Sequence, residues 1–391
     1  MIKNESTKKS LRSSPKIALV HDYLREYGGA ERVLEALHTM YPDAPVFTAF
    51  CDEKALGQHW RRFAEWDIRQ TWMSRIPGIL RLYSPLRILA ARAFSSLDLV
   101  EFDVVISSTN AYMAKAVRVP HGVHICYCHT PPRSLYGYST MSDWKKKWWM
   151  RVPGELINHV MRIIDFKTAQ DVDVFIANSQ ETAKRIQKFY RRESTVIFPP
   201  VHIASTSGKM SDSKKTTLSE KSYAIYVNRL AFAKHPELAV QACTELGMQL
   251  KVVGTGPLLP ELQAMAGPTV TFLGSVTDQE LHELYAGASV LLYPVEDEDF
   301  GIVPIEAMGH GVPVIAHASG GPLETIISGK TGVFFEDLTV AGLIAAIKEF
   351  NKLLNKNANQ FDPTIIKKQA QQYDTSVFEE KIEKLVCGQS N

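Results

Sequence analysis

Long apolar segments are missing from this sequence. No run of about 18 apolar residues occurs, which argues against a membrane-spanning helix. The first 16 residues, MIKNESTKKSLRSSPK, lack the apolar core of a secretory signal peptide. Cysteine is scarce: the five cysteines are scattered and odd in number, which argues against a disulfide framework and favours a reducing compartment. These absences predict a cytoplasmic protein.

Motifs for common cofactors are missing as well. Gly28 and Gly29 do not belong to a G-x-G-x-x-G fingerprint, which disfavours a dinucleotide site and an NAD-dependent dehydrogenase. No Asp-x-Asp motif stands in a context suited to metal binding, because Asp171 and Asp173 lie inside an expected strand. The cluster of Cys126, Cys128 and His129 lacks a second pair at ligand spacing, which disfavours zinc. We therefore expect no metal ion and no other cofactor.

The composition is that of a soluble globular protein, with 391 residues, 45% of them hydrophobic and 22% charged. This length allows two domains, each with its own core. The net charge of +2 conceals an asymmetry, because residues 1–195 carry 29 Lys/Arg against 20 Asp/Glu and residues 196–391 carry 15 against 22. Only the basic half is expected to meet an anionic surface, and nothing indicates a nucleic-acid partner.

Short β-type runs alternate regularly with amphipathic segments, which predicts an α/β protein with parallel, doubly wound sheets. Strands are expected over 16–20, 102–107, 123–128, 171–178, 223–228, 250–254 and 270–273. Helices are expected over 30–40, over 180–190, after Pro236 and behind the capping box of Thr277 and Glu280. Residues 202–222 contain few large apolar side chains and read as a flexible loop. We expect a tail over 1–15, a first domain over 16–200, a linker over 201–222 and a second domain over 223–372.

The most informative stretch covers residues 290–325, VLLYPVEDEDFGIVPIEAMGHGVPVIAHASGGPLET. It predicts a buried strand, an acidic loop, a short helix with Pro304 in its first turn, a second strand and a Gly-Gly turn. Glu298 at the end of the loop and Glu306, expected in the first helical turn, both follow the carboxyl end of a strand, where open α/β sheets bind ligands. Two carboxylates there can accept hydrogen bonds from sugar hydroxyls. A solvated acidic loop is the alternative.

Three other places carry candidate binding groups. Gly28 and Gly29 follow the first strand and open a helix, where the backbone can approach a phosphate, although a plain tight turn fits them too. His129 follows the strand over 123–128, which favours the cleft over the core. Arg229 and Lys234 follow the strand over 223–228, as a diphosphate clamp requires, although solvated charges are the alternative.

The motif EDFGIVPIEAMGHGVPVIA, followed by GGPLETI, resembles the signature of family 4 retaining glycosyltransferases, which have the GT-B fold. Its Glu-x7-Glu spacing, the flanking Phe-Gly and the trailing Gly-Gly carry the resemblance. The resemblance covers roughly residues 16 to 386 and implies two Rossmann-like domains facing a cleft. It implies a donor nucleotide sugar on the second domain, an acceptor on the first, and a C-terminal segment, 373–391, that returns to the first domain.

The resemblance also implies a role for each candidate residue. Glu306 matches the glutamate that holds the ribose of the nucleotide, and Glu298 matches the one that holds hydroxyls of the transferred sugar. Arg229 and Lys234 match the cations that neutralise the diphosphate, which Gly28 and Gly29 approach from the other side. His129 matches a histidine near the donor sugar. The same family signature assigns three further residues to the donor site: Phe300, Gly301 and Ile302.

The donor and the acceptor follow from the resemblance alone. The motifs CHTPPR and HDYLREYGGAERV look like those of bacterial GDP-mannose-dependent mannosyltransferases of polysaccharide assembly, which favours GDP-mannose as the donor. The sequence does not identify the base. Many relatives use lipid-linked acceptors at the cytoplasmic face of the membrane.

Three other kinds of protein could share parts of this pattern. An epimerase or a phosphorylase acting on nucleotide sugars could use the same two-domain scaffold and the same carboxylates. A two-domain solute-binding protein is disfavoured by the missing signal peptide. A dehydrogenase is disfavoured by the missing fingerprint. Release of free nucleotide only in the presence of an acceptor would separate a transferase from the others.

Two stretches of the basic half mix cations with large apolar residues, as proteins at a bilayer interface do. Residues 71–94 contain Arg75, Arg81, Arg87 and Arg92 among Trp, Leu and Ile, and residues 144–151 read WKKKWWMR. We therefore expect the first domain to bind an anionic membrane peripherally. In the alternative, the Leu and Ile side chains of the first stretch pack on the core.

Overall fold

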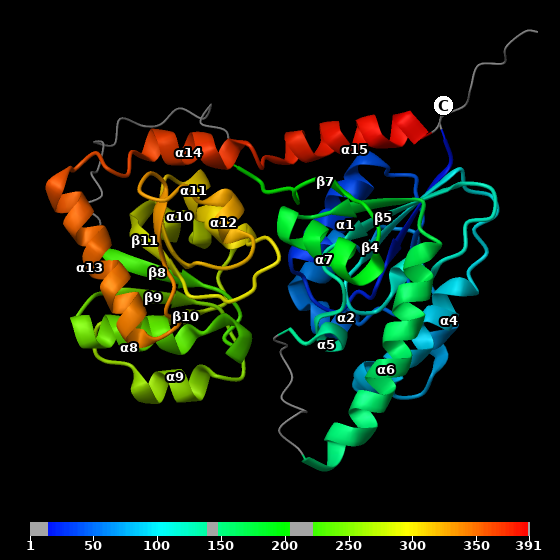
Figure 1. The fold of residues 1–391 in the computed structure, drawn as a ribbon, viewed down its shortest axis with the longest axis horizontal. Coiled ribbons are helices and arrows are strands. Elements are labelled where there is room, and N and C mark those ends of the chain that lie inside the picture. Colours follow the sequence, from blue (N-terminus) through cyan, green and yellow to red (C-terminus); the bar gives the residue numbers. More distant parts are fainter. Residues whose placement is uncertain (1–14, 139–147, 204–221, 390–391) are drawn as a thin grey trace, which may run out of the picture.

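Two α/β domains lie side by side, and the chain crosses between them at one end (Figure 1). The computed structural model describes residues 15–138, 148–203 and 222–389. The expected tail over 1–15 and the linker over 201–222 fall almost entirely outside these ranges. No helix of the described residues is long and apolar enough to cross a bilayer.

The first domain is built on a parallel seven-stranded sheet in the order β3-β2-β1-β4-β5-β6-β7. Strand β1 pairs with β2 on one side and with β4 on the other, so the strand order reverses between β1 and β4. The strands are β1 (Ile17–His21), β2 (Val46–Thr48), β3 (Ile68–Gln70), β4 (Val104–Thr109), β5 (Val123–Cys128), β6 (Val174–Ala177) and β7 (Thr195–Val196).

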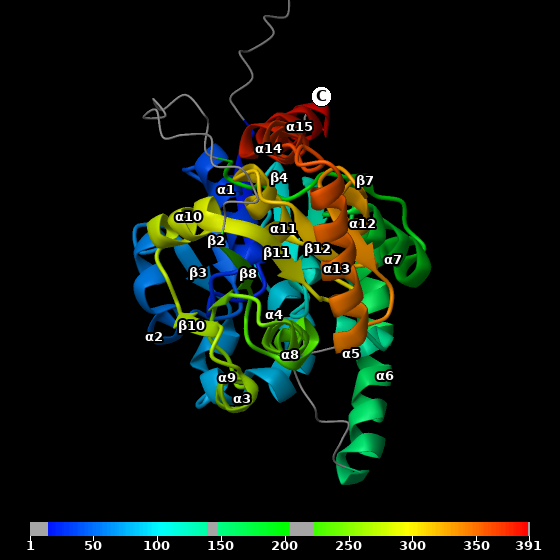
Figure 2. The ribbon, with the colours of Figure 1, turned by 90° about the vertical axis from the view of Figure 1, so that its left-hand side faces the viewer.

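Helices cover both faces of this sheet, and α6 extends beyond the rest of the domain (Figures 1 and 2). The α-helices are α1 (Gly29–Met40), α2 (Glu53–Leu56), α3 (Ile79–Leu86), α4 (Ala90–Ser95), α5 (Arg133–Tyr136), α6 (Trp148–Gln170) and α7 (Gln180–Tyr190). Short 3-10 turns are η1 (Gly57–Arg62), η2 (Trp72–Arg75), η3 (Arg87–Leu89) and η4 (Ala114–Ala116).

The second domain repeats this plan with a parallel six-stranded sheet in the order β10-β9-β8-β11-β12-β13. Its strands are β8 (Tyr223–Val227), β9 (Leu250–Val253), β10 (Val270–Gly274), β11 (Ala288–Tyr293), β12 (Val314–His317) and β13 (Gly332–Phe335). Its helical segments are η7 (Phe232–Lys234), α8 (Pro236–Leu246), α9 (Leu259–Met265), α10 (Asp278–Gly287), α11 (Ile302–Gly309), α12 (Pro322–Thr325), α13 (Val340–Lys356) and α14 (Pro363–Gln371).

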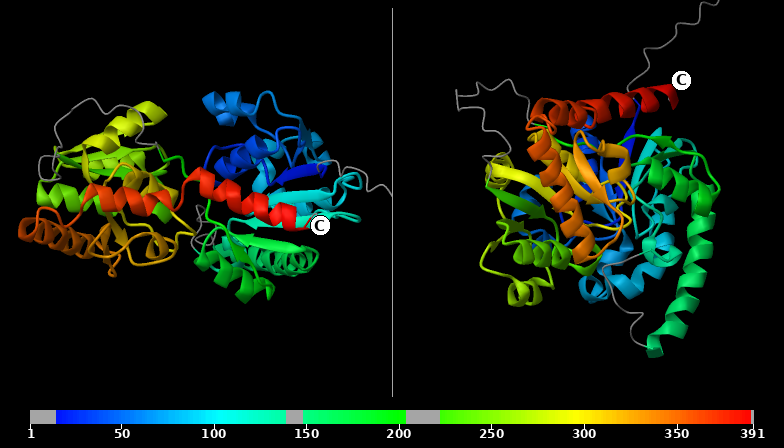
Figure 3. Two further views of the ribbon diagram at one scale, coloured as in Figure 1. Left: turned by 90° about the horizontal axis from the view of Figure 1, so that it is seen from above. Right: turned by 60° about the vertical axis from the view of Figure 1, so that its left-hand side comes forward.

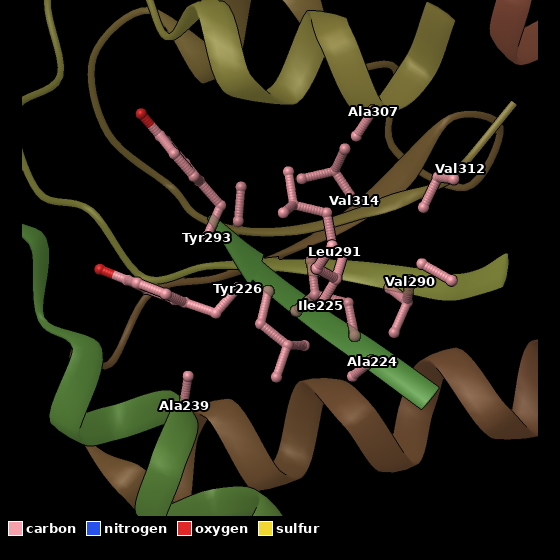
Figure 4. Close-up of a cluster of buried hydrophobic side chains, with 14 of the residues drawn as sticks. Ala224, Ile225, Tyr226, Ala239, Val290, Leu291, Tyr293, Ala307, Val312 and Val314 are labelled. Atoms are coloured by element: carbon pink, nitrogen blue, oxygen red, sulfur yellow. The ribbon is translucent and has the colours of Figure 1, made fainter. Parts of the chain in front are cut away.

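The core of the second domain lies on both faces of β8 and β11. Figure 4 shows Ile225 and Tyr226 of β8 beside Leu291 and Tyr293 of β11, with Val314 of β12 next to them. These strands are continuous apolar runs because helices cover both sides of the sheet. The same property allowed β8 and β11 to be expected from the sequence, with ends shifted by one or two residues.

The chain passes between the domains twice. Val201 of the first crossing pairs with the second crossing, donating to Tyr373 O at 3.1 Å and accepting from Thr375 N at 3.2 Å. Helix α15 (Thr375–Gln389) then runs over the first domain, as the view from above shows (Figure 3). Its Phe378 and Ile382 lie in one cluster with Val33 of α1. The C-terminal helix thus completes the core of the first domain.

One predicted position needs correction. Helix α11 begins at Ile302, so Pro304 lies in its first turn but Glu306 lies in the second, not in the first as expected. Gly301, which follows the acidic loop, is the N-cap of α11. The helix therefore starts at Ile302, too late in the chain for Glu306 to lie in its first turn.

Candidate active site

The points where the strand order reverses in the two sheets face one another. The first domain brings the ends of β1 and β4 there, and the second domain brings the ends of β8 and β11. Contacts between Arg32 and Glu306, and between Arg229 and Glu26, join the two domains at this place. Since open α/β sheets bind ligands at such points, the cleft is the candidate active site.

The side chain of Glu298, in the acidic loop, is largely enclosed and only 14% exposed. It accepts hydrogen bonds from Lys234 Nζ and from Tyr293 OH, the latter at 3.0 Å. Burial acts to raise the pKa of Glu298, but Lys234 and then Arg133 outweigh it and lower that pKa to about 2. Glu298 is therefore a largely enclosed, ionised group, and the alternative of a solvated loop is wrong for it.

The Gly-Gly turn after β12 packs directly on the acidic loop. Gly321 N donates to Glu298 O at 2.8 Å, and Ser319 Oγ accepts from Asp297 N at 3.0 Å. A Cβ at Gly320 would lie 2.2 Å from Glu298 O, and one at Gly321 would lie 2.2 Å from Phe300 O. Only glycine allows this approach, so the trailing Gly-Gly of the motif supports the loop that carries Glu298.

Glu306 pairs across the cleft with Arg32 of α1. Burial acts to lower the pKa of the Arg32 guanidinium, but the larger effect of Glu306 raises it. A Cβ at Gly29 would lie 3.1 Å from Ile302 Cδ1, which places the start of α1 against the start of α11. Glu306 and Arg32 also line a cavity of about 450 Å³ that opens between the domains, beside the buried Tyr285.

Arg229 and Lys234 contact different carboxylates. The guanidinium of Arg229 pairs with Glu26 of the first domain, whereas Lys234 pairs with Glu298 of its own domain. Both cations lie on the loop after β8 and face the cleft. Each is held by a carboxylate close to the expected position of the donor.

His129 follows β5, as predicted, and belongs to a chain of buried polar groups. Its Nε2 lies 2.8 Å from Ser108 Oγ, which lies 3.1 Å from His21 Nδ1. His21 Nε2 lies 3.4 Å from Glu31, whose other oxygen accepts from Gly28 N at 2.8 Å. Burial, with a smaller effect of His21, lowers the pKa of His129 to about 3. His129 is therefore a neutral imidazole whose position is linked to the glycine loop.

Phe300 does not present its ring to the cleft. The ring is buried and stacks on Phe198 at 5.5 Å between centroids, with Tyr373 at 5.7 Å. The ring of Phe300 thus packs in the core of the second domain. A donor contact of Phe300 through its backbone stays a prediction, as do the contacts of Gly301 and Ile302.

Several residues at the cleft were not singled out from the sequence. Arg32 and Glu31 stand in the GGAER segment, three and two residues after Gly29, so the glycine motif could have pointed to them. Arg133 ends the HTPPR motif, but no role followed from that position. Arg185 on α7 has no local signal, because its partner Asp299 is 114 residues away in the sequence.

Comparison with known proteins places both domains. The sequence model described as Glycosyltransferase Family 4 matches residues 27–205, and the one described as Glycosyl transferases group 1 matches residues 209–367. Alpha-1,3/1,6-mannosyltransferase alg2 of Schizosaccharomyces pombe is 27% identical over 378 residues, which cover 84% of this chain and 72% of that one. The GDP-mannose-dependent alpha-(1-6)-phosphatidylinositol monomannoside mannosyltransferase of Mycolicibacterium smegmatis is 32% identical over 147 residues, or 33% of this chain and 38% of that one.

Solved structures share the fold at low identity. Sucrose-phosphate synthase (tll1590) from Thermosynechococcus elongatus has a TM-score of 0.70 at 18% identity, covering 95% of this chain and 98% of that one. Anabaena Alr3699/HepE in complex with UDP and glucose has a TM-score of 0.67 at 18% identity, covering 96% and 100%. With two Rossmann-like domains on a common cleft and both domains matched by family models, the chain belongs to the family 4 glycosyltransferases of the GT-B fold.

Proposed function

We propose that this glycosyltransferase moves mannose from GDP-mannose to a lipid-linked or polysaccharide acceptor, with retention of configuration and without a metal ion. The observation that carries the proposal is the pairing of Glu298 with Lys234 at the carboxyl end of β11, opposite the first domain. The names of the relatives support the sugar, since those in Schizosaccharomyces pombe and Mycolicibacterium smegmatis are both mannosyltransferases.

The two glutamates would bind different parts of the donor. Glu306 would accept hydrogen bonds from the ribose, and the cavity beside it has room for a nucleoside. Glu298, ionised and fixed by Lys234 and Tyr293, would accept hydrogen bonds from hydroxyls of the transferred sugar. An ionised carboxylate near the sugar also favours the positive charge that develops on the ring as the glycosyl–phosphate bond breaks.

The leaving diphosphate would be held by fixed cations and backbone groups. Arg229 and Lys234 lie on the loop after β8, and Gly28 and Gly29 approach from the first domain. Negative charge grows on the diphosphate during bond breaking, and two cations can stabilise it in place of a metal ion. Within the described residues, no group of three or more His, Cys, Asp or Glu side chains is arranged to hold a metal.

Turnover tests this proposal directly. The protein should release GDP from GDP-mannose when a mannosyl acceptor is present, and turnover should persist after treatment with a chelator. Release of nucleotide without an acceptor, or isomerisation of the sugar, would instead support an enzyme of the phosphorylase or epimerase type. A requirement for divalent metal would contradict the metal-free reaction.

A membrane surface on the first domain is the second part of the proposal. Side chains of η2, α3 and η3 are exposed there, among them Trp72 at 37% and Leu82 at 50%. Arg75, Arg81 and Arg92 are exposed in the same segment. The alternative of core packing is correct for Ile79, which is buried. Arg87 does not face solvent freely, because it donates to Ser134 and Asn158.

Helix α6 adds a second exposed apolar stripe. Its members recur at helical spacing and include Val152 at 80% and Leu156 at 66% exposed, with Ile157, Val160 and Ile163 following. The basic segment with Trp144 and Lys145 to Lys147 lies outside the described residues, immediately before this helix. Apolar and basic groups together favour the interface of an anionic bilayer.

Sedimentation with liposomes tests the membrane surface. The protein should co-sediment with vesicles that contain anionic lipid at low ionic strength, and salt should weaken binding. Charge reversal of Lys145, Lys146 and Lys147 should reduce it. No binding of the wild-type protein at low ionic strength would contradict the membrane surface and favour a soluble acceptor.

A further inference from the structure

Two arginines of the first domain, Arg133 and Arg185, hold the acidic loop of the second domain. We call this set of contacts the grip. Arg133 begins α5 and Arg185 lies on α7, and both reach the loop that carries Glu298. Arg133 donates to Asp297 O at 2.6 Å and lies 3.0 Å from the Asp299 carboxylate. Arg185 pairs with the same carboxylate and donates to Asp297 O at 3.3 Å.

Contacts within the first domain fix the position of the Arg185 guanidinium. The side chain is only 2% exposed, and its Nε donates to Glu181 one turn earlier at 3.1 Å. The guanidinium lies over the ring of Tyr138 at 4.2 Å and contacts Thr130 Oγ1 at 3.3 Å. A fully buried arginine with this many contacts is a rigid fork aimed at the loop.

The backbone of this loop is strained at Asp297, and contacts with the two arginines can stabilise the strained conformation. Asp297 has a φ of +53°, a left-handed conformation that is unfavourable for a residue with a side chain. Its carbonyl accepts from both arginines, so the conformation of the residue before Glu298 depends on the other domain. Ser319 and Gly321 hold the loop from its own domain, which leaves the arginines to fix its cleft side.

Helix α7 connects this grip to other contacts between the domains. The amides of Gln180 and Glu181 at its start both donate to Glu324 of α12 at 2.8 Å. Thr182 Oγ1 donates to His129 O at 3.2 Å. One rigid helix thus touches the residue after β5 and, through Arg185, the loop of Glu298.

We propose that Arg133 and Arg185 are positioning residues that set the Glu298 loop when the domains come together. In this arrangement the sugar-binding carboxylate is in place only when the first domain, which carries the acceptor, is closed on the second. Donor that binds to the second domain alone would then meet a loop with its cleft side unfixed. The inference rests on the proposed role of Glu298 for its effect on catalysis, but not for its effect on the loop.

The chain offers a matched control for loss of an interdomain ion pair. Arg62 of the first domain pairs with Asp278 of the second at 3.1 Å, and no described contact links it to the acidic loop. Arg62→Gln therefore removes an arginine–carboxylate pair at another place between the domains, together with the pair of Arg62 and Glu35 inside the first domain. Asp299→Asn removes the shared charge from the side of the second domain, and it leaves the side chain of Arg185 itself unchanged and paired with Glu181.

Hydrogen exchange followed by mass spectrometry tests the grip on the full-length protein. We expect Arg133→Gln and Asp299→Asn to speed amide exchange in residues 296–301 about tenfold or more and to leave strands β8 and β11 unchanged. Arg62→Gln should leave the loop at the wild-type rate. Unchanged exchange of the loop in both test variants would overturn the inference, and faster exchange throughout the protein would overturn it too, because that is general loss of stability.

Kinetics then test the consequence for catalysis. A displacement of about 1 Å can cost about a hundredfold in rate, so we expect kcat to fall about tenfold to a hundredfold while the affinity for bare GDP stays at the wild-type value. Arg133→Lys, which keeps the positive charge near Glu298, should recover part of kcat. Wild-type kcat in Arg133→Gln and Asp299→Asn would overturn the positioning role. Absence of turnover in the wild type would instead contradict the proposed function. The hydrogen-exchange result would still show whether the two arginines hold the loop.

Discussion

The two glutamates of the motif lie eight positions apart, yet their surroundings differ. Glu298 pairs inside its own domain, with Lys234 and Tyr293, and its loop is packed from several sides. Glu306 pairs across the cleft with Arg32, whose side chain is 34% exposed, on the wall of a cavity. At the sugar end of the proposed donor site, Glu298 can keep its partners when the donor binds. At the nucleotide end, a ribose would have to replace the contact between Glu306 and Arg32.

This difference suggests a division of labour between the two ends. In the closed arrangement Glu298 is already ionised and held in place, which suits a group whose charge matters in the transition state, because it needs no rearrangement during the reaction. A carboxylate held by a partly exposed arginine suits a group that binds and releases a substrate, because such a pair contributes little to stability. The expected effects of substitution therefore fall chiefly on kcat at Glu298 and on affinity at Glu306.

The largest effect is expected at Glu298. Glu298→Gln keeps the shape of the side chain but removes the charge, and kcat should fall about a hundredfold to a thousandfold. The matched control is Glu296→Gln, because Glu296 lies in the same acidic loop but is assigned no contact with the sugar. Steady-state turnover of GDP-mannose measures both. Equal losses in the two variants would mean that the charge of the whole loop matters, rather than Glu298.

The next largest effect is expected at Arg229, between the two ends. Arg229→Ala removes a cation from the proposed leaving group, and kcat/KM should fall about a hundredfold with the thermal unfolding temperature unchanged. Glu26→Gln, which removes only the partner of Arg229, is the control and should retain most of the activity. Wild-type turnover in Arg229→Ala would remove this residue from the diphosphate site.

A small effect of opposite sign is expected at the nucleotide end. Arg32→Gln frees Glu306 from its partner, and a partly exposed pair contributes up to about 1 kcal/mol. The affinity for GDP should therefore rise by up to about fivefold, as measured by isothermal titration calorimetry. A marked loss of GDP affinity would show that Arg32 binds the nucleotide itself.

The smallest effect is on stability and depends on pH. Burial lowers the pKa of His129 to about 3, against an ordinary value of 6.5, so below that value the unfolded chain binds more protons than the folded one. Stability should therefore decrease as the pH falls, and His129 should contribute about 1 kcal/mol of the decrease between about pH 8 and pH 6. Urea unfolding of the wild type and of His129→Gln at both pH values measures this contribution. The same decrease in both proteins would contradict the low pKa.

The sequence revealed those parts of the fold and site that depend on neighbouring residues. Strand β5 and helix α7 have the predicted bounds, because a strand flanked by turn residues and a Ser179 cap are local signals. The burial of Tyr226 and Leu291 follows from continuous apolar runs. Glu298 and Glu306 could be singled out because their motif is short and specific.

The remaining features depend on residues far apart in the chain. Arg32 meets Glu306 across 274 positions, and Arg133 reaches Asp297 across 164. Such contacts depend on how two domains are set against each other, for which no local pattern exists. The long helix α6 was not expected either, because its exposed face carries valine, leucine and isoleucine where a polar face would normally appear.

The affinity of GDP for Glu298→Gln and Glu306→Gln, measured side by side by calorimetry, tests the division of labour most directly. We predict that Glu298→Gln binds GDP as the wild type does, because the nucleotide does not touch this carboxylate, and that Glu306→Gln binds it about tenfold or more weakly, as loss of a hydrogen-bonded charged group requires. Equal affinities in the two variants, or a loss confined to Glu298→Gln, would contradict the account.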